Sequence, residues 1–407
     1  MSICRRGSPL PEPWPDLATL KHWFRQFIES RDSQAAERCI ATAVRLGATS
    51  QQMADMLFAA ATDHRFIDVG HTLDFTNKAL EALDKLEWEN NLSLVESVLT
   101  SLVPGYAKAE KMEESGSWRH PIDLVTILEN GFTELPVALE NGNRVRVSTQ
   151  RQQKTEDKQP KQRWSIDNPD KDALVAVLLG NDPQLIVNAL LEELRHGTTE
   201  VELASIVCYA AALRIAQFHT RNEFSDWDAA LHTFTFSNAV HQGLRRLPTM
   251  DLLRGVFDAA IRIYLNRFLN IPPAIIPKKS THDKVIDPDI TLRELTELLD
   301  KQQRVNETGQ LVADYLYHGG RIDQLTSMLG KLLLREDRNF HSIQMIEAAY
   351  RQYSLLDNED NNAARVNTLS AASRYLAAHS PTMRSQDRTY QIANQLHHGE
   401  ELFVEIT

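Results

Sequence analysis

Cysteine is scarce in this chain of 407 residues, which holds only Cys4, Cys39 and Cys208. None of them belongs to a C-x-x-C pair or lies beside a histidine in a C-x-H cluster. We therefore expect no structural zinc knot, no cysteine-ligated iron–sulfur centre and no disulfide framework. So few unpaired thiols are typical of a reducing compartment, and we expect a cytoplasmic protein.

Several functional signatures are also missing. The sequence contains no G-x-x-x-x-G-K-[ST] loop, no G-x-G-x-x-G turn and no G-x-S-x-G elbow, so neither a nucleotide cradle nor a serine-hydrolase nucleophile is expected. Apolar runs such as residues 173–179 are much shorter than the roughly 20 residues of a membrane span. The N-terminus has no apolar run typical of a signal peptide. We expect no membrane insertion.

Charge and periodicity set the broad class of the protein. Acidic residues outnumber basic ones, 55 to 44, and the net charge of −11 disfavours a nucleic-acid partner. Apolar residues recur at helical spacing almost throughout, whereas the alternation typical of strands is weak and best seen at residues 144–147. These patterns predict an all-α protein.

One sequence pattern occurs twice: a helix that ends at a glycine, followed by a threonine that caps the next helix. This pattern is called the corner below. Helices are predicted over residues 16–28, 33–46 and 53–66, with Gly47 ending the second and Thr49 capping the third. Gly197 and Thr199 repeat this corner, and both copies continue to an H-T-x-x-F-x-N motif that starts at His71 and at His232. The repetition predicts two homologous helical halves packed around a central pocket, plus a C-terminal helical extension. The expected ranges are 1–140 for the first half, 141–170 for a polar linker, 171–277 for the second half and 278–407 for the extension.

Histidine and carboxylate residues follow a helical stripe in each half. Positions i, i+4 and i+7 share one face of a helix, and two sets have this spacing: His64, Asp68 and His71, then His219, Glu223 and Asp226. Facing helices with nitrogen and oxygen donors build iron, manganese or zinc sites in helical bundles. The predicted metal ligands are His64, His71, His219, Glu223 and His232.

Further residues are expected around this site. Additional ligands, or acceptors that orient the imidazoles, are Asp68, Asp226, His241, Glu114 and His120. The substrate pocket is expected to include Arg119, Trp227, Phe234 and Phe236. For residues 113–121 the alternative interpretation is a helix end with an Arg–Glu pair and a packed tryptophan.

A structural interpretation of the repeated motif competes with the metal site. In it, His71-Thr72 and His232-Thr233 are helix-start signals. Phe75 and Phe236 then pack in the core, and Asn77 and Asn238 bond to a neighbouring helix. Because solvated polar stripes are common on helices, the metal hypothesis depends on the two sets of imidazoles converging.

Several separated motifs together resemble a known kind of domain. They span residues 61–66, 70–71, 117–124, 222–228, 232–241 and 267–274. The chain resembles a poorly characterised bacterial all-helical domain that in many relatives is joined to a Rieske-type ferredoxin domain. This resemblance implies a redox context. The chain has no Cys-x-His and Cys-x-x-His pair of its own, so the implied electron donor is a separate ferredoxin-type protein.

The sequence hypothesis is therefore a metal-dependent oxidoreductase or oxygenase, with non-haem iron, acting on a small organic molecule. Haem held by two of the histidines and metal-assisted hydrolysis with zinc are variants of this hypothesis. The alternative from another class is a non-catalytic helical module that binds a protein partner.

Overall fold

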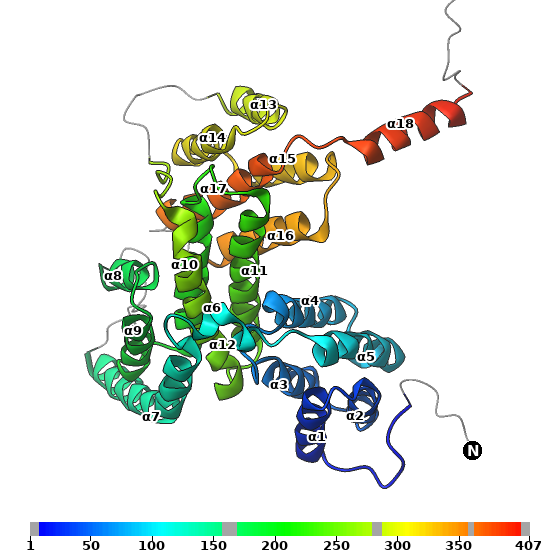
Figure 1. The fold of residues 1–407 in the computed structure, drawn as a ribbon, viewed down its shortest axis with the longest axis vertical. Helices are drawn as coiled ribbons and strands as arrows, with labels where there is room; N and C mark the ends of the chain where they lie inside the picture. The colour runs from blue at the N-terminus through cyan, green and yellow to red at the C-terminus, as the bar shows by residue number, and fades with distance from the viewer. Residues whose placement is uncertain (1–7, 157–168, 279–286, 357–361, 400–407) are drawn as a thin grey trace, which may run out of the picture. The chain divides into compact units, whose positions relative to one another are not determined.

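The computed structural model describes residues 8–156, 169–278, 287–356 and 362–399. Over these ranges every regular element is a helix, with eighteen α-helices, four short 3₁₀ helices and no strand (Figure 1). The all-α prediction is confirmed. None of the described helices is both long enough and apolar enough for a membrane span.

The chain forms two compact units. Over the described ranges, the first unit contains residues 8–156, 169–211 and 232–267, and the second contains residues 212–231, 268–278, 287–356 and 362–399. Helices α10 (Glu200–Ala216) and α11 (Phe224–Arg246) each begin in one unit and end in the other. Compactness is a different property from internal homology, so the predicted boundaries of the homologous halves stay a prediction.

The N-terminal part of the first unit is a group of five helices: α1 (Leu17–Glu29), α2 (Ser33–Arg45), α3 (Ser50–Ala61), α4 (His71–Lys85) and α5 (Leu92–Lys108). Helix α1 packs on α2, α3 and α5, and α4 packs on α3 and α5 (Figure 1). The predicted helix end at Gly47 and the predicted helix cap at Thr49 are confirmed. Gly47 has a left-handed φ of +78°, and Thr49 forms a capping box with Gln52.

Short elements connect helices within this group and link the group to the rest of the unit. They are η1 (Ile67–Gly70), η2 (Trp88–Asn90), η3 (Met112–Glu114) and α6 (Gly116–Arg119). The unit continues with α7 (Leu124–Glu156), α8 (Pro169–Leu178), α9 (Pro183–Arg195) and α12 (Met250–Leu265), and η4 (Asn266–Asn270) begins at its end.

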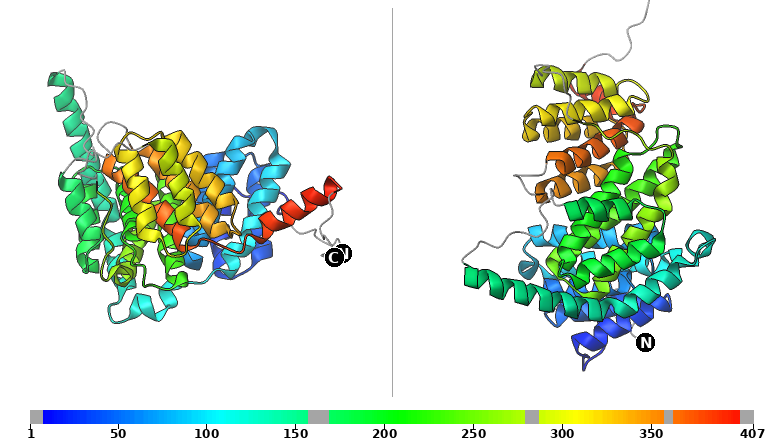
Figure 2. Two further views of the ribbon diagram at one scale, coloured as in Figure 1. Left: turned by 90° about the horizontal axis from the view of Figure 1, so that it is seen from above. Right: turned by 90° about the vertical axis from the view of Figure 1, so that its left-hand side faces the viewer.

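The polar segment predicted as an exposed linker is largely helical. Helix α7 continues without a break as far as Glu156, and residues 157–168 lie outside the described part of the chain. In Figure 2 this long helix extends well beyond the helices that it packs against. A Cβ on Gly142 would lie 2.0 Å from the carbonyl oxygen of Leu194, so the missing side chain lets α7 and α9 approach closely.

The second unit contains the C-terminal helices. They are α13 (Pro288–Leu299), α14 (Val305–Tyr317), α15 (Ile322–Leu334), α16 (Phe340–Leu355), α17 (Asn362–Ala378) and α18 (Ser385–His397). Helix α17 packs against α13, α14 and α16. The buried Arg374 of α17 donates hydrogen bonds to Asn306 Oδ1 at 2.6 Å and to the Phe218 carbonyl at 2.7 Å. The described residues of the predicted C-terminal extension are largely helical.

Candidate metal centre

The two predicted stripes do not lie on helices. Helix α3 ends at Ala61, and a turn and η1 follow, so His64, Asp68 and His71 do not share one helical face. In the second copy α10 ends at Ala216 and α11 begins at Phe224, which leaves His219 and Glu223 in a turn. The apolar pattern on each side of these turns is helical, and for that reason periodicity placed each set of polar side chains on one helical face.

The turn before α4 has an unusual backbone. Phe66, Asp68 and Val69 have φ angles of +48°, +51° and +49°, and Gly70 has +94°. Left-handed conformations are costly for residues with a Cβ and persist only where surrounding contacts hold them. Here the Asp68 N–H donates to the Glu110 carbonyl at 2.9 Å, which joins the turn to the loop before η3.

The side chains of Arg65 and Glu113 hold the same turn against the rest of the first unit. Buried Arg65 donates to Asp258 Oδ1 of α12 at 3.0 Å. The backbone N–H of Arg65 donates to Glu113 Oε2 at 3.2 Å. Glu114, which was predicted to lie at the site, is exposed, whereas the adjacent Glu113 is half-buried and was not predicted. No sequence pattern distinguishes these adjacent glutamates, because loop geometry decides which one faces inward.

His64 is held by carboxylates on both sides of its ring. Its Nδ1 lies 2.5 Å from Glu113 Oε1, and its Nε2 lies 2.7 Å from Glu29 Oε2. Burial lowers the pKa of His64, but the hydrogen bonds and charges of these carboxylates outweigh burial and raise it overall. A protonated imidazole donates from both nitrogens and has no lone pair for a metal. In this arrangement His64 is an ion-pair residue, contrary to its predicted role as a ligand.

His71 and His232 do come together. Their Nε2 atoms lie 3.1 Å apart, and the rings meet edge to face at 78° with centroids separated by 4.5 Å. Both histidines are half-buried in the first unit. Each is the first residue of one H-T-x-x-F-x-N motif, so equivalent positions of the repeated sequence are in contact.

The first residue of α4, His71, and an interior residue of α11, His232, supply these two rings. Toward the C-terminal ends of the two helices, Arg246 pairs with Asp84, with one N–O distance of 3.0 Å. Beside the N-terminus of α4, Phe66 packs edge to face on Phe236, with ring centroids 4.9 Å apart. Gly70 permits this approach, since a Cβ there would lie 3.0 Å from Phe236 Cβ.

The geometry of the pair fits a shared metal ion. Two imidazole nitrogens at about 2.0–2.1 Å from one tetrahedral ion are separated by about 3.3 Å. The Nε2 separation of 3.1 Å is close to that value, and both residues belong to a histidine group able to hold a metal ion. Without an ion, the same atoms can share one N–H···N hydrogen bond.

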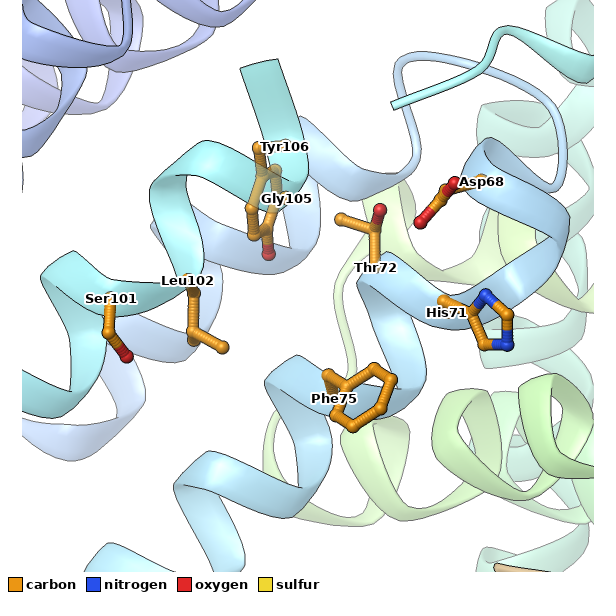
Figure 3. A pocket seen from close by; sticks show the side chains of 8 residues that line it. All are labelled: Asp68, His71, Thr72, Phe75, Ser101, Leu102, Gly105 and Tyr106. Carbon is orange, nitrogen blue, oxygen red and sulfur yellow. The ribbon is translucent and has the colours of Figure 1, made fainter. Parts of the chain in front are cut away.

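A pocket lies beside this pair, between η1, α4 and α5 (Figure 3). Its volume is about 270 Å³, and its lining residues are Asp68, His71, Thr72, Phe75, Ser101, Leu102, Gly105 and Tyr106. The ring nitrogens of His71 point away from Leu102 and Phe75, on the side opposite the pocket wall formed by α5. His71 borders the pocket, and Asp68 and Thr72 lie at the same end of the pocket as His71.

Two of these lining side chains differ in their hydrogen bonding. Burial raises the pKa of Tyr106, whose hydroxyl donates to the Leu57 carbonyl at 3.1 Å and contacts Thr76 Oγ1 at 2.7 Å. The Thr72 side chain is 6% exposed, and its hydroxyl has no hydrogen-bond partner among the residues that the structure describes. Tyr106 and the other lining residues of α5 were not predicted, because that helix carries no histidine and these lining residues include no carboxylate.

The predicted residues around the start of α11 have local roles in the second unit. His219 Nδ1 accepts the Arg221 N–H at 3.1 Å, and Asp226 Oδ2 accepts the Glu223 N–H at 3.0 Å, which caps the first turn of α11. The Glu223 side chain is exposed. Trp227 is buried against Phe218, with centroids 4.2 Å apart.

The loop over residues 113–121 agrees only in part with the alternative interpretation, a helix end with an Arg–Glu pair and a packed tryptophan. Trp118 is fully buried, whereas Glu114 and His120 are exposed. Arg119 pairs with Asp123 at 3.1 Å instead of with a glutamate, and its Nε donates to the Glu113 carbonyl.

The structural interpretation of the repeated motif also holds only in part. His71 starts α4, but His232 lies inside α11. Phe236 is buried, whereas Phe75 is 43% exposed and lines the pocket. Asn77 bonds to Glu81 of its own helix at 3.0 Å.

The remaining selected residues of α11 lie in the core. Phe234 and His241 are both buried, like Phe236. Neither Phe234 nor Phe236 belongs to the lining of the pocket beside His71. No protein family, curated protein or solved structure was found to match the chain.

Proposed function

We propose that the chain binds a transition-metal ion through His71 and His232 and acts as a metal-dependent enzyme on a small organic molecule. The observation that carries the proposal is the Nε2 separation of 3.1 Å between these half-buried imidazoles. The adjacent pocket of about 270 Å³ supports a small substrate. Two imidazoles leave the other coordination positions to further donors, as catalytic sites require.

We propose non-haem iron as the ion and an oxidoreductase as the class of enzyme. Imidazole is a good ligand for iron, which when bound supplies one-electron redox chemistry. A haem between two imidazoles needs their nitrogens about 4 Å apart on opposite faces of the ring. The 3.1 Å separation favours a single ion over a haem held by His71 and His232. A ferredoxin-type electron donor, expected from the family resemblance, stays part of this proposal.

The experiment compares metal uptake by histidine variants of the full chain. Anaerobic equilibrium dialysis against Fe²⁺, followed by elemental analysis, is expected to give stoichiometric iron in the unaltered chain. His71→Ala and His232→Ala should each weaken uptake by at least tenfold, because each removes a ligand. His22→Ala, at an exposed histidine of α1, is the matched control and should leave uptake unchanged.

A double variant separates this proposal from the helical-stripe hypothesis. His64→Ala combined with His219→Ala should retain iron, since neither residue belongs to the His71–His232 pair. Loss of iron in the double variant, with uptake intact in His71→Ala, would contradict the proposal. Uptake of zinc alone would favour hydrolysis, and a metal-free chain whose stability does not change on chelation would favour a non-catalytic binding module.

A further inference from the structure

Asp68 supplies the only carboxylate among the residues that line this pocket. Asp68 lines the pocket beside His71, and its carboxylate points from η1 toward the side on which Thr72 lies (Figure 3). Within the described part of the chain, this carboxylate has no ion pair and no side-chain hydrogen bond. Asp68 is half-buried, and a carboxylate beside an apolar wall is stabilised by a nearby cation or hydrogen-bond donor.

A second polar group at the same end of the pocket also lacks a partner. The hydroxyl of Thr72 is buried and makes no hydrogen bond to any residue that the structure describes. Buried hydroxyls are normally satisfied, so the hydroxyl of Thr72 has hydrogen-bonding capacity left for a water molecule or a ligand in the pocket. A hydroxyl oxygen can accept a hydrogen bond from a cationic N–H donor.

The rest of the pocket is suited to an apolar group. Phe75, Leu102 and the ring of Tyr106 form its wall, and Gly105 leaves space between them. The volume of about 270 Å³ exceeds the roughly 150 Å³ of a cavity that holds one benzene ring. An aromatic ring with a short side chain therefore fits, and the ring of Phe75 also favours a nearby cation.

We propose that this pocket binds a small organic amine whose ammonium group pairs with Asp68 and donates to Thr72, while its apolar body contacts Phe75 and Leu102. The inference rests on the proposed function only where it identifies this amine as the substrate of the His71–His232 centre. Binding of the amine itself depends on the pocket residues and needs no metal.

The first test compares three probes of matched shape on the unaltered full chain after chelation. Isothermal titration calorimetry is performed with 2-phenylethylammonium, 2-phenylethanol and 3-phenylpropanoate. The amine is expected to bind at least tenfold more tightly than the alcohol, because a hydrogen bond between charged groups is stronger than a neutral one. The carboxylate should bind most weakly. Equal binding of alcohol and amine, or no binding of the amine, would overturn the inference.

The second test uses substitutions that keep the backbone conformation. Asp68→Asn removes the charge at a left-handed position that asparagine also tolerates, and should weaken amine binding at least tenfold without weakening alcohol binding. Thr72→Val should weaken amine binding severalfold. Glu114→Gln, at an exposed carboxylate outside the pocket, is the control and should have no effect. Amine affinity that is unchanged in a folded Asp68→Asn variant would contradict the inference.

These measurements distinguish the two proposals. Because the calorimetry uses chelated protein, a failure of metal binding leaves the amine result unaffected. Conversely, stoichiometric iron together with no amine preference would overturn only the assignment of the substrate class. Should Asp68→Asn fail to fold, which circular dichroism would show, the comparison of the three probes on the unaltered chain still decides.

Discussion

At the scale of single residues, His64 has the clearest electrostatic role. It links Glu29 at the end of α1 to Glu113 of η3, and Lys111 also pairs with Glu29 at 2.6 Å. Burial raises the pKa of Glu113, but the hydrogen bond from His64 and the other hydrogen bonds to it outweigh burial and lower it overall. For Glu29, the hydrogen bonds from Lys111 and His64 lower the pKa. When His64 is protonated, its imidazole therefore stabilises the turn that leads to Asp68 and His71.

The sign of the pKa shift gives a prediction for stability. Since the folded-state pKa of His64 is raised above 6.5, its contribution is fully present below that pH and is lost as the pH rises through the folded value. His64→Gln should lower the free energy of unfolding by about 1–2 kcal/mol at pH 6 and by much less at pH 9. Urea denaturation at both pH values measures this difference.

The control for this prediction is His22→Gln, at an exposed position of α1. It should change stability little at either pH. An equal loss at pH 6 and pH 9 in His64→Gln would show that packing, and not the charge of the imidazole, supplies the stabilisation.

At the scale of elements, the junction of η1 and α4 determines where His71 lies. Gly70 has a φ of +94°, and a Cβ there would lie 3.0 Å from Phe236 Cβ and 3.1 Å from Phe66 Cε2. Gly47 also has a left-handed φ, +78°, but a Cβ there would meet nothing within 4 Å. The two glycines share a left-handed backbone conformation and differ in packing.

Alanine at each glycine separates these effects. Gly47→Ala should cost about 1 kcal/mol from backbone strain alone. Gly70→Ala should cost about 2–4 kcal/mol, because overpacking between η1 and α11 is added to the strain. Urea denaturation measures both values, and metal uptake should weaken only in Gly70→Ala. Equal costs would contradict the close approach of η1 to α11.

At the scale of the whole molecule, α10 and α11 belong to both compact units. An interruption in either helix would therefore disturb core residues of each unit. Continuous helices propagate order cooperatively along the backbone. We expect the chain to unfold in one transition.

Substitutions in the two cores test this expectation. Leu99 in the first unit and Leu329 in the second are fully buried. Leu99→Ala and Leu329→Ala should each cost about 2–5 kcal/mol and shift the whole transition, seen by circular dichroism and by tryptophan fluorescence alike. A transition that splits in either variant, or probes that do not coincide, would show that the units unfold independently.

Local features of the fold were predictable because they depend on short-range physics. The cap at Thr49, the left-handed glycine at position 47 and the helical periodicity are each encoded within a few residues. The break between Ala61 and His71 was not predictable, since Arg65, Asp258 and Glu113 hold that turn through contacts distant in sequence. Periodicity therefore placed His64 and His71 on one face, which the structure contradicts.

The sequence alone determined that the protein is helical and that the repeated motif begins with His71 and His232. Propensity, capping and charge are properties of neighbouring residues, so they can be read along the chain. Tertiary structure alone decided that these two imidazoles meet while His64 binds carboxylates, and that Asp68 and Thr72 share a pocket with α5. Which side chains converge depends on how α4, α5 and α11 pack, and packing sums many long-range contacts that no local pattern contains.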